Sequence, residues 1–208
     1  MTEKSEIIKI MLLGDSSVGK TSFIQRYTED TFQDSYLSTY GIDHKIKFFE
    51  HSNKKTYKLF FYDTAGQEKY KSIALNIIKN ADGIILLYDI TQNETFEAIS
   101  SWMEDIESLK GKGFPIVLIG NKIDLEEMRV VETKEGQNLA KQYKINFFET
   151  SNKDGTNIEK ACLSLINIIV NEREISILND FEIIKKDEKI ILENKKVVKH
   201  KKRKCFKK

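Results

Sequence analysis

The residues with the clearest chemical potential lie near the start of the chain, where Gly14–Thr21 reads G-D-S-S-V-G-K-T. This string matches G-x-x-x-x-G-K-[ST], in which backbone N–H groups wrap phosphate oxygens. It joins an apolar run at 7–13 to a helical pattern, so a helix N-terminus should add its dipole. We expect Lys20 to bridge β- and γ-phosphate oxygens and the Thr21 hydroxyl to bind Mg²⁺. The candidate phosphate-binding residues are Ser16, Ser17, Val18, Gly19, Lys20, Thr21 and Ser22.

A second motif, N-K-I-D at 121–124, discriminates between nucleotide bases. A phosphate loop alone leaves ATPases, nucleotide kinases and GTPases open. The Asp124 carboxylate can accept hydrogen bonds from N1–H and the exocyclic amine of guanine, and adenine lacks that donor pair. A third base contact is expected at 149–153, E-T-S-N-K, where a backbone N–H can meet the guanine O6. The base-site candidates are Asn121, Lys122, Asp124, Ser151, Asn152 and Lys153.

Between these motifs, F-F-Y-D-T-A-G-Q-E at 60–68 offers the groups that phosphate hydrolysis needs. Asp63 can hold Mg²⁺ through a water, and Gly66 can present its N–H to the γ-phosphate because no side chain blocks the approach. Gln67 is then placed to orient the attacking water. Upstream, Thr39 in S-T-Y-G-I-D can reach Mg²⁺ only while the γ-phosphate holds its loop. The predicted metal ligands are Thr21, Thr39 and Asp63, and the predicted catalytic residues are Gln67, Lys20 and Thr39.

Six apolar runs and the helical patterns between them must position these motifs. The runs cover 7–13, 45–49, 57–62, 83–88, 115–120 and 145–149, and are typical of strands buried on both faces. Only H-S-N-K-K separates the second run from the third, so these two should form an antiparallel hairpin. Apolar residues at helical spacing over 158–169 include Cys162, which is therefore predicted to be a core residue. We predict a doubly wound α/β domain with a six-stranded, mixed, mostly parallel sheet and about five helices.

Charge and composition divide the 208 residues unevenly around a net charge of +2. Residues 195–208 hold nine Lys/Arg and no acidic residue, which leaves 25 basic against 32 acidic residues in 1–194. The acidic body argues against a nucleic-acid-binding domain, and the basic tail suggests either an anionic membrane or a nuclear-import or nucleic-acid partner. The apolar rhythm stops after Val170, so we predict a domain at 1–170 and a largely disordered extension at 171–208. Two cysteines and no apolar leader point to the cytosol.

With its motifs in this order, the chain resembles the Ras-superfamily small GTPases and, among them, the Rab branch. The resemblance covers residues 7 to about 170 and is carried by G-D-S-S-V-G-K-T, S-T-Y-G-I-D, D-T-A-G-Q-E and G-I-I-L-L-Y-D-I-T. It implies a GTP/GDP switch that hydrolyses GTP with Mg²⁺ and recruits effectors in vesicle and membrane trafficking. It also implies that Phe32 packs against the guanine and that Tyr36 lies over the phosphates. Exchange factors and GTPase-activating proteins are the further partners that it implies.

The chain departs from the Rab pattern at the positions of an aromatic trio, usually Phe, Trp and Tyr, that shapes the effector surface. Those positions hold His44, Tyr62 and Ile77, which leaves the Rab subgroup and its effectors open. The family's S-A-K is Ser151-Asn152-Lys153 here, which bears on nucleotide affinity. The alternatives are a scaffold that binds GTP without turnover, another Ras-superfamily branch, and a P-loop ATPase or nucleotide kinase, against which N-K-I-D argues.

The arginines of the chain are Arg26, Arg129, Arg173 and Arg203, and none falls in either switch segment, roughly 32–45 and 66–80 by the family pattern. Phosphoryl transfer needs positive charge near the developing transition state. We therefore predict slow intrinsic hydrolysis and an arginine supplied by a partner.

The C-terminal C-F-K-K places Cys205 at the spacing of a C-a-a-X box, although lysines occupy the second a and the X. A single lipid chain binds membranes marginally and needs a second signal, which the basic tail could supply. We expect a prenylated Cys205 and the basic tail to place the protein on the cytosolic face of an endomembrane or the plasma membrane. Reversible electrostatic association, another acylation of Cys205 and the absence of an anchor are the alternatives.

Overall fold

The computed structural model describes residues 5–33, 42–64 and 71–178. The chain divides into two compact units, Met1–Asn167 and Ile168–Lys208. In the second unit the described residues, 168–178, continue a helix that begins at 158. The first eight residues of the predicted extension, 171–178, are therefore helical. The polybasic tail lies outside the described residues.

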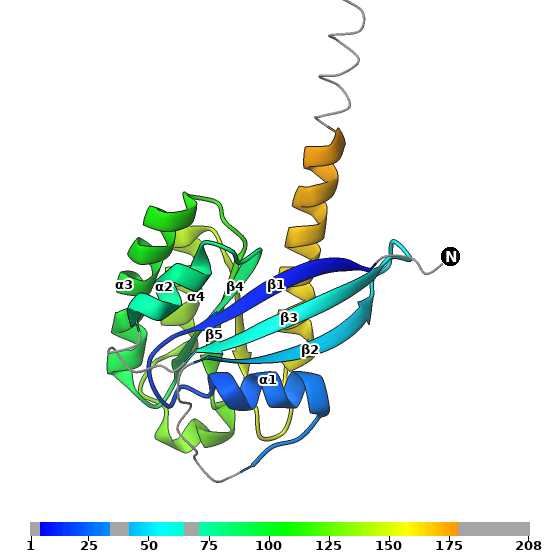
Figure 1. Ribbon diagram of the computed structural model, residues 1–208. Coiled ribbons are helices and arrows are strands. Elements are labelled where there is room, and N and C mark those ends of the chain that lie inside the picture. The colour runs from blue at the N-terminus through cyan, green and yellow to red at the C-terminus, as the bar shows by residue number, and fades with distance from the viewer. Residues whose placement is uncertain (1–4, 34–41, 65–70, 179–208) are drawn as a thin grey trace, which may run out of the picture. The chain divides into compact units, whose positions relative to one another are not determined.

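Six strands form one sheet in the order β2-β3-β1-β4-β5-β6 (Figure 1). Their bounds are β1 Glu6–Leu13, β2 Ile42–Glu50, β3 Thr56–Thr64, β4 Gly83–Asp89, β5 Ile116–Asn121 and β6 Asn146–Thr150. β2 pairs with β3 in antiparallel register, and the neighbours β3-β1, β1-β4, β4-β5 and β5-β6 are parallel. All six apolar runs thus form strands, which confirms the predicted sheet and its single hairpin.

Helices cover both faces of this sheet. The helices are α1 Lys20–Glu29, α2 Lys71–Ile78, α3 Asn93–Lys110, α4 Thr133–Tyr143, a 3₁₀ helix at Ile123–Met128 and the helix at 158–178. Figure 1 shows α1 on one face, and α2, α3 and α4 together on the other. The described residues therefore contain the predicted α/β fold with five α-helices. None of the helices among them is long and apolar enough to cross a membrane.

Alternating side chains of the central strands build a core on each face of the sheet. Met11 and Leu13 of β1 join the buried cluster under α2, α3 and α4. Ile10 and Leu12 are equally buried and, by the strand's period of two, point to the face that carries α1. Because both faces of the central strands are covered, β4 and β5 are buried along their whole length, and their polar residues Asp89 and Asn121 stand where the strands end.

Cys162 lies in the helix at 158–178 and is fully buried, as the helical spacing predicted. Burial raises the pKa of its thiol, because the thiolate would lose its hydration. Cys162 is therefore an unreactive core residue rather than a nucleophile.

Candidate active site

The loop between β1 and α1 has the backbone shape that a phosphate cradle requires. Ser17 and Gly19 have positive φ values of 64° and 99°, and Gly19 is the N-cap of α1. Gly19 has no side chain that could cap the first N–H groups of α1, so the helix begins with N–H groups directed at the loop. A helix N-terminus framed by such a loop favours an anion.

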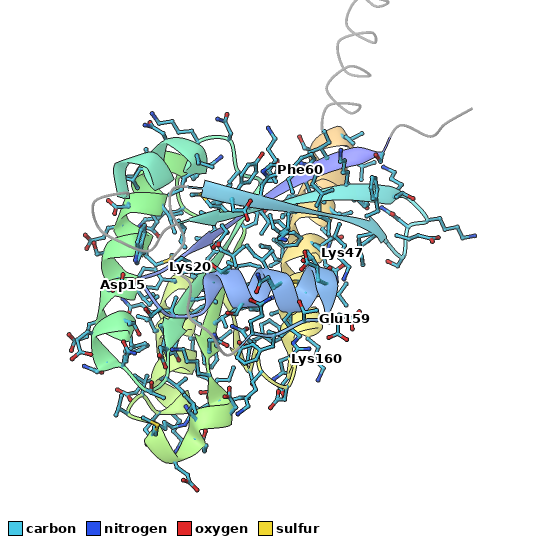
Figure 2. All side chains as sticks on the ribbon, turned by 60° about the horizontal axis from the view of Figure 1, so that its bottom comes forward. Asp15, Lys20, Lys47, Phe60, Glu159 and Lys160 are labelled. Carbon is cyan, nitrogen blue, oxygen red and sulfur yellow. The ribbon has the colours of Figure 1, made fainter. Side chains whose placement is uncertain are left out.

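Lys20 occupies the inside of this loop and is only 5% exposed. Its Nζ donates hydrogen bonds to the carbonyl of Gly14 at 2.9 Å and to the carbonyl of Asp15 at 2.6 Å. Figure 2 shows Asp15 and Lys20 beside each other at the start of α1. Burial lowers the pKa of Lys20 to about 8, although Asp63 and Asp15 oppose the shift. A buried cation held only by carbonyl dipoles in these contacts is a suitable partner for phosphate oxygens.

Two of the predicted metal ligands meet at the carboxyl ends of β1 and β3. The Thr21 hydroxyl donates a hydrogen bond of 2.5 Å to Oδ2 of Asp63, whose side chain is 3% exposed. Hydroxyl and carboxylate oxygens are the ligand type that Mg²⁺ prefers, and these two lie beside the phosphate loop. The residues present therefore fit a magnesium ion that keeps several other ligands from water and phosphate.

The motif after β5 joins the phosphate loop directly. Asn121 is fully buried, and its Nδ2 donates a hydrogen bond of 2.8 Å to the carbonyl of Val18. Thr150, at the end of β6, donates through its hydroxyl to Oδ1 of Asn121 at 3.0 Å. Both polar ends of this amide are thus fixed, and the ends of β5 and β6 are tied to the loop after β1.

The carboxylate of Asp124 is held at the exposed rim of the same region. The Ser151 hydroxyl donates a hydrogen bond of 2.8 Å to its Oδ1, which links N-K-I-D to the loop after β6. Lys122, between them, places its Nζ 2.6 Å from Oδ2 of the buried Asp89 at the end of β4. The motif after β5 is therefore held from β4 on one side and from β6 on the other.

The loop after β6 is itself held by α1. Arg26 donates to the carbonyls of Asn152 and Lys153, through Nε at 2.8 Å and through Nη2 at 2.6 Å. The Asn152 side chain also points inward, and its Nδ2 donates a hydrogen bond of 2.9 Å to the carbonyl of Gly19. Lys153 remains exposed.

The structure thus brings together the predicted phosphate, metal and base residues that it describes. Phe32, after α1, is half-buried, and Ser22 lies in the first turn of α1. Tyr36, Thr39, Gly66, Gln67 and Cys205 lie outside the described residues. Of the aromatic trio positions, His44 pairs in register with Tyr62, whereas Ile77 packs against the core under α3.

Three supporting residues were missed by the sequence analysis. Asp89 stands at the end of β4, and its position beside Lys122 could have been expected because parallel strands end at one edge. Trp102 belongs to no motif, yet its Nε1 donates a hydrogen bond of 3.0 Å to Oδ1 of Asp15. Arg26 carries no motif signal, since it acts on backbone carbonyls that any residue has.

Comparison with known proteins agrees with this architecture. A family model described as Ras family matches residues 9–171. Ras-related protein Rab-3C of Bos taurus is 41% identical over 174 residues, covering 84% of this chain and 76% of that protein. Ras-related protein Rab-3B of Homo sapiens is 41% identical over 174 residues, covering 84% and 79%. Ras-related protein Rab-13 of Rattus norvegicus is 44% identical over 164 residues, covering 79% and 80%.

The chain therefore belongs to the Ras family of small GTPases. Within that family it is Rab-like, a GTP hydrolase of the class that works as a switch in membrane trafficking. Guanine nucleotide is its ligand, and effectors, exchange factors and GTPase-activating proteins are the general partners of its class.

Proposed function

We propose that this GTPase binds and hydrolyses GTP in the region formed by the phosphate loop, Gly14–Thr21, the Thr21–Asp63 pair and the two base loops after β5 and β6. The observation that carries the proposal is the 2.8 Å hydrogen bond from Asn121 to the carbonyl of Val18. It fixes the base-reading motif against the phosphate-binding loop, so one nucleotide can span both. The GTPase class supplies the reaction, and these residues supply its place in the chain.

Each end of the nucleotide meets a distinct chemistry. Lys20 neutralises the β- and γ-phosphate oxygens and replaces its present carbonyl contacts with a stronger, charge-assisted one. Thr21, Asp63 and Thr39 hold Mg²⁺, which when bound neutralises charge on the phosphate oxygens. Asp124, oriented by Ser151, accepts from N1–H and the exocyclic amine of guanine. Phe32 and Tyr36 cover the base and the phosphates.

Hydrolysis needs one positive group that the described site does not contribute. Gln67 orients the attacking water, and Gly66 donates its N–H to the γ-phosphate. Of the three described arginines, two belong to the first unit: Arg26 is bound to the carbonyls after β6, and Arg129 forms ion pairs with Glu126 and Glu149. Both arginines are already committed, so intrinsic turnover is slow and a GTPase-activating partner supplies the arginine.

The surface for effectors adjoins the two switch segments. β2 starts at Ile42, inside the first segment of roughly 32–45, and β3 ends at Thr64, just before the second. On the face opposite α1, this hairpin exposes Ile46 and Phe48, and the Phe48 side chain is 63% exposed. Figure 2 shows Phe60 on this uncovered face and Lys47 on the α1 side. Effectors that read the ordered switches would bury this apolar face at the same time.

Membrane attachment completes the proposed function. The basic residues of 195–208 attract an anionic leaflet, and a prenyl group on Cys205 supplies the second signal. The protein would then act on the cytosolic face of an endomembrane or the plasma membrane. Intact-mass measurement of the native protein tests this part, since an unmodified full-length C-terminus rules the lipid out.

The nucleotide site is tested by binding and single-turnover hydrolysis of GTP and ATP in parallel, with and without a GTPase-activating domain. We expect GTP to bind, ATP to fail, and the domain to accelerate hydrolysis by about 10³- to 10⁵-fold. The variant Asp124→Asn replaces an acceptor by an amide donor, which suits the 2-carbonyl of xanthine better than the 2-amine of guanine. A shift in preference from GTP to xanthosine triphosphate supports the base site, and unchanged GTP preference contradicts it.

A further inference from the structure

The side chain of Asn152 connects the loop after β6 to the phosphate loop, two segments that are far apart in the sequence. Its Nδ2 donates a hydrogen bond of 2.9 Å to the carbonyl of Gly19, across 133 positions. The side chain is 5% exposed. The family's S-A-K motif has alanine at this position, and an alanine cannot make this bond.

Two amide side chains therefore bind consecutive carbonyls of the phosphate loop. Asn121 binds the carbonyl of Val18, and Asn152 binds that of Gly19. A Cβ atom on Gly19 would lie 2.4 Å from Nδ2 of Asn121 and 2.7 Å from Nδ2 of Asn152. The absence of a side chain at Gly19 is what lets both amides approach the loop.

The orientation of the Asn152 amide is set by its bond to Gly19, because its other polar atom, Oδ1, has no partner among the described residues. Oδ1 is buried and has no hydrogen-bond partner in the described part of the chain. An unpaired buried acceptor is unfavourable by about 1–3 kcal/mol. Turning the amide over would not remove this cost, because Oδ1 would then face the carbonyl oxygen of Gly19. The bond to Gly19 thus decides the orientation.

The backbone of Asn152 is held as well, by an arginine of α1. Arg26 donates to the carbonyls of Asn152 and Lys153, and its side chain is 16% exposed. Arg26 lies in α1, the helix that starts at the phosphate loop. The loop after β6 is thus fastened to the phosphate side of the site through both the side chain and the carbonyl of Asn152.

We propose that Asn152 is a positioning residue that locks the guanine loop onto the phosphate loop and slows nucleotide release. The inference rests on the proposed nucleotide site. A nucleotide that contacts both the base loop and the phosphate loop is held best while these loops keep their spacing, and the Asn152–Gly19 bond fixes that spacing. Because the family residue at this position has no such bond, this chain depends more strongly on an exchange factor to release GDP.

The test measures dissociation of fluorescent GDP from the full-length protein in the presence of Mg²⁺. Asn152→Ala, which introduces the family residue, is expected to accelerate release by about 2- to 12-fold, the range for one hydrogen bond. Asn152→Asp keeps the shape of the side chain but turns a carboxylate oxygen toward the carbonyl of Gly19. GDP is expected to leave Asn152→Asp at least as fast as it leaves Asn152→Ala.

The aspartate variant separates hydrogen bonding from packing. If Asn152 only fills space, Asn152→Asp releases GDP like the parent, and that result overturns the proposal. An Asn152→Ala rate within twofold of the parent also overturns it. Asn146→Ala, which removes an exposed 2.8 Å hydrogen bond to Ser164, is the matched control and should release GDP like the parent.

A double mutant tests whether the Asn152–Gly19 bond and the Arg26 hydrogen bonds hold the same loop. Arg26→Met alone is expected to accelerate GDP release, and combined with Asn152→Ala it should give less than the product of the two effects. Independent, multiplicative effects contradict a shared lock. A parent protein that fails to retain GDP overturns the proposed site and this inference with it, whereas a parent that retains GDP beside unaltered Asn152 variants overturns the inference alone.

Discussion

The Asn121 amide donates a hydrogen bond of 2.8 Å to the carbonyl of Val18, which is 103 positions earlier in the chain. Its other end accepts from the Thr150 hydroxyl at 3.0 Å. This one buried side chain therefore joins the loops after β1, β5 and β6, which are three of the strands whose carboxyl ends form the site. The finding gives Asn121 a structural role that precedes any contact with a base.

Removing this amide should loosen all three loops together. In Asn121→Ala, the Val18 carbonyl and the Thr150 hydroxyl lose their partners in a buried region. We expect GDP to dissociate about 10- to 100-fold faster, as befits two lost hydrogen bonds. Stopped-flow release of fluorescent GDP measures the effect. The exposed Asn93, which hydrogen-bonds Glu97 within α3, is a control position whose alanine variant should retain GDP normally.

The pKa of Lys20 makes nucleotide binding depend on pH. The folded-state value of about 8 lies below the unfolded value of 10.5, so the folded protein without nucleotide binds this proton less tightly. Burial of the charged amine therefore opposes folding by about 3 kcal/mol below pH 8, and this opposition vanishes as the pH rises toward 10.5. Phosphate oxygens favour the charged amine, so nucleotide binding should raise its pKa and take up a proton above pH 8.

The measurable consequence is a GDP dissociation constant that increases above about pH 8, by at most about tenfold per pH unit. Isothermal titration calorimetry between pH 7 and 9 follows it. Lys20→Met removes the titrating amine, so its weaker binding should show only the titration of the nucleotide itself. A parent profile parallel to that of Lys20→Met would mean that Lys20 stays fully charged in the free protein.

The sequence predicted the elements better than the contacts between them. Apolar runs buried on both faces of a sheet leave a strong local signal, so every strand and the single hairpin were found. The phosphate loop and N-K-I-D were found for a similar reason, because their chemistry lies within a few adjacent residues. The Trp102–Asp15 and Asn152–Gly19 bonds left no such signal, since each depends on where packing brings two distant segments.

An ion-pair network stabilises the motif after β5. Arg129 is 9% exposed and contacts Oε1 of Glu149 at 2.7 Å and Oε2 of Glu126 at 2.7 Å. The hydrogen bonds to Glu126 and Glu149 raise the pKa of Arg129 above its usual value. Glu149 is only 16% exposed, so Arg129→Met leaves a carboxylate with little access to water. We expect a loss of about 2–4 kcal/mol in the free energy of unfolding.

Urea unfolding of the GDP-bound protein measures this loss. The exposed ion pair of Lys55 with Glu6, 3.2 Å apart and nearly half exposed on both sides, provides the comparison. Lys55→Met should change the free energy by less than about 1 kcal/mol. Equal effects of the two substitutions would show that the Arg129 network contributes no more than a surface pair.

Gln67 provides the test of chemistry rather than of binding. Leucine at this position has a similar size but cannot hydrogen-bond the attacking water, so Gln67→Leu should slow single-turnover GTP hydrolysis at least tenfold, about 1.4 kcal/mol of activation free energy. The substitution should also prevent the GTPase-activating domain from accelerating the reaction, because the supplied arginine acts on water that is no longer oriented. GDP release depends on the loops joined by Asn121 and should stay close to that of the parent. Gln67→Leu that hydrolyses GTP as fast as the parent would assign the orientation of water to another group.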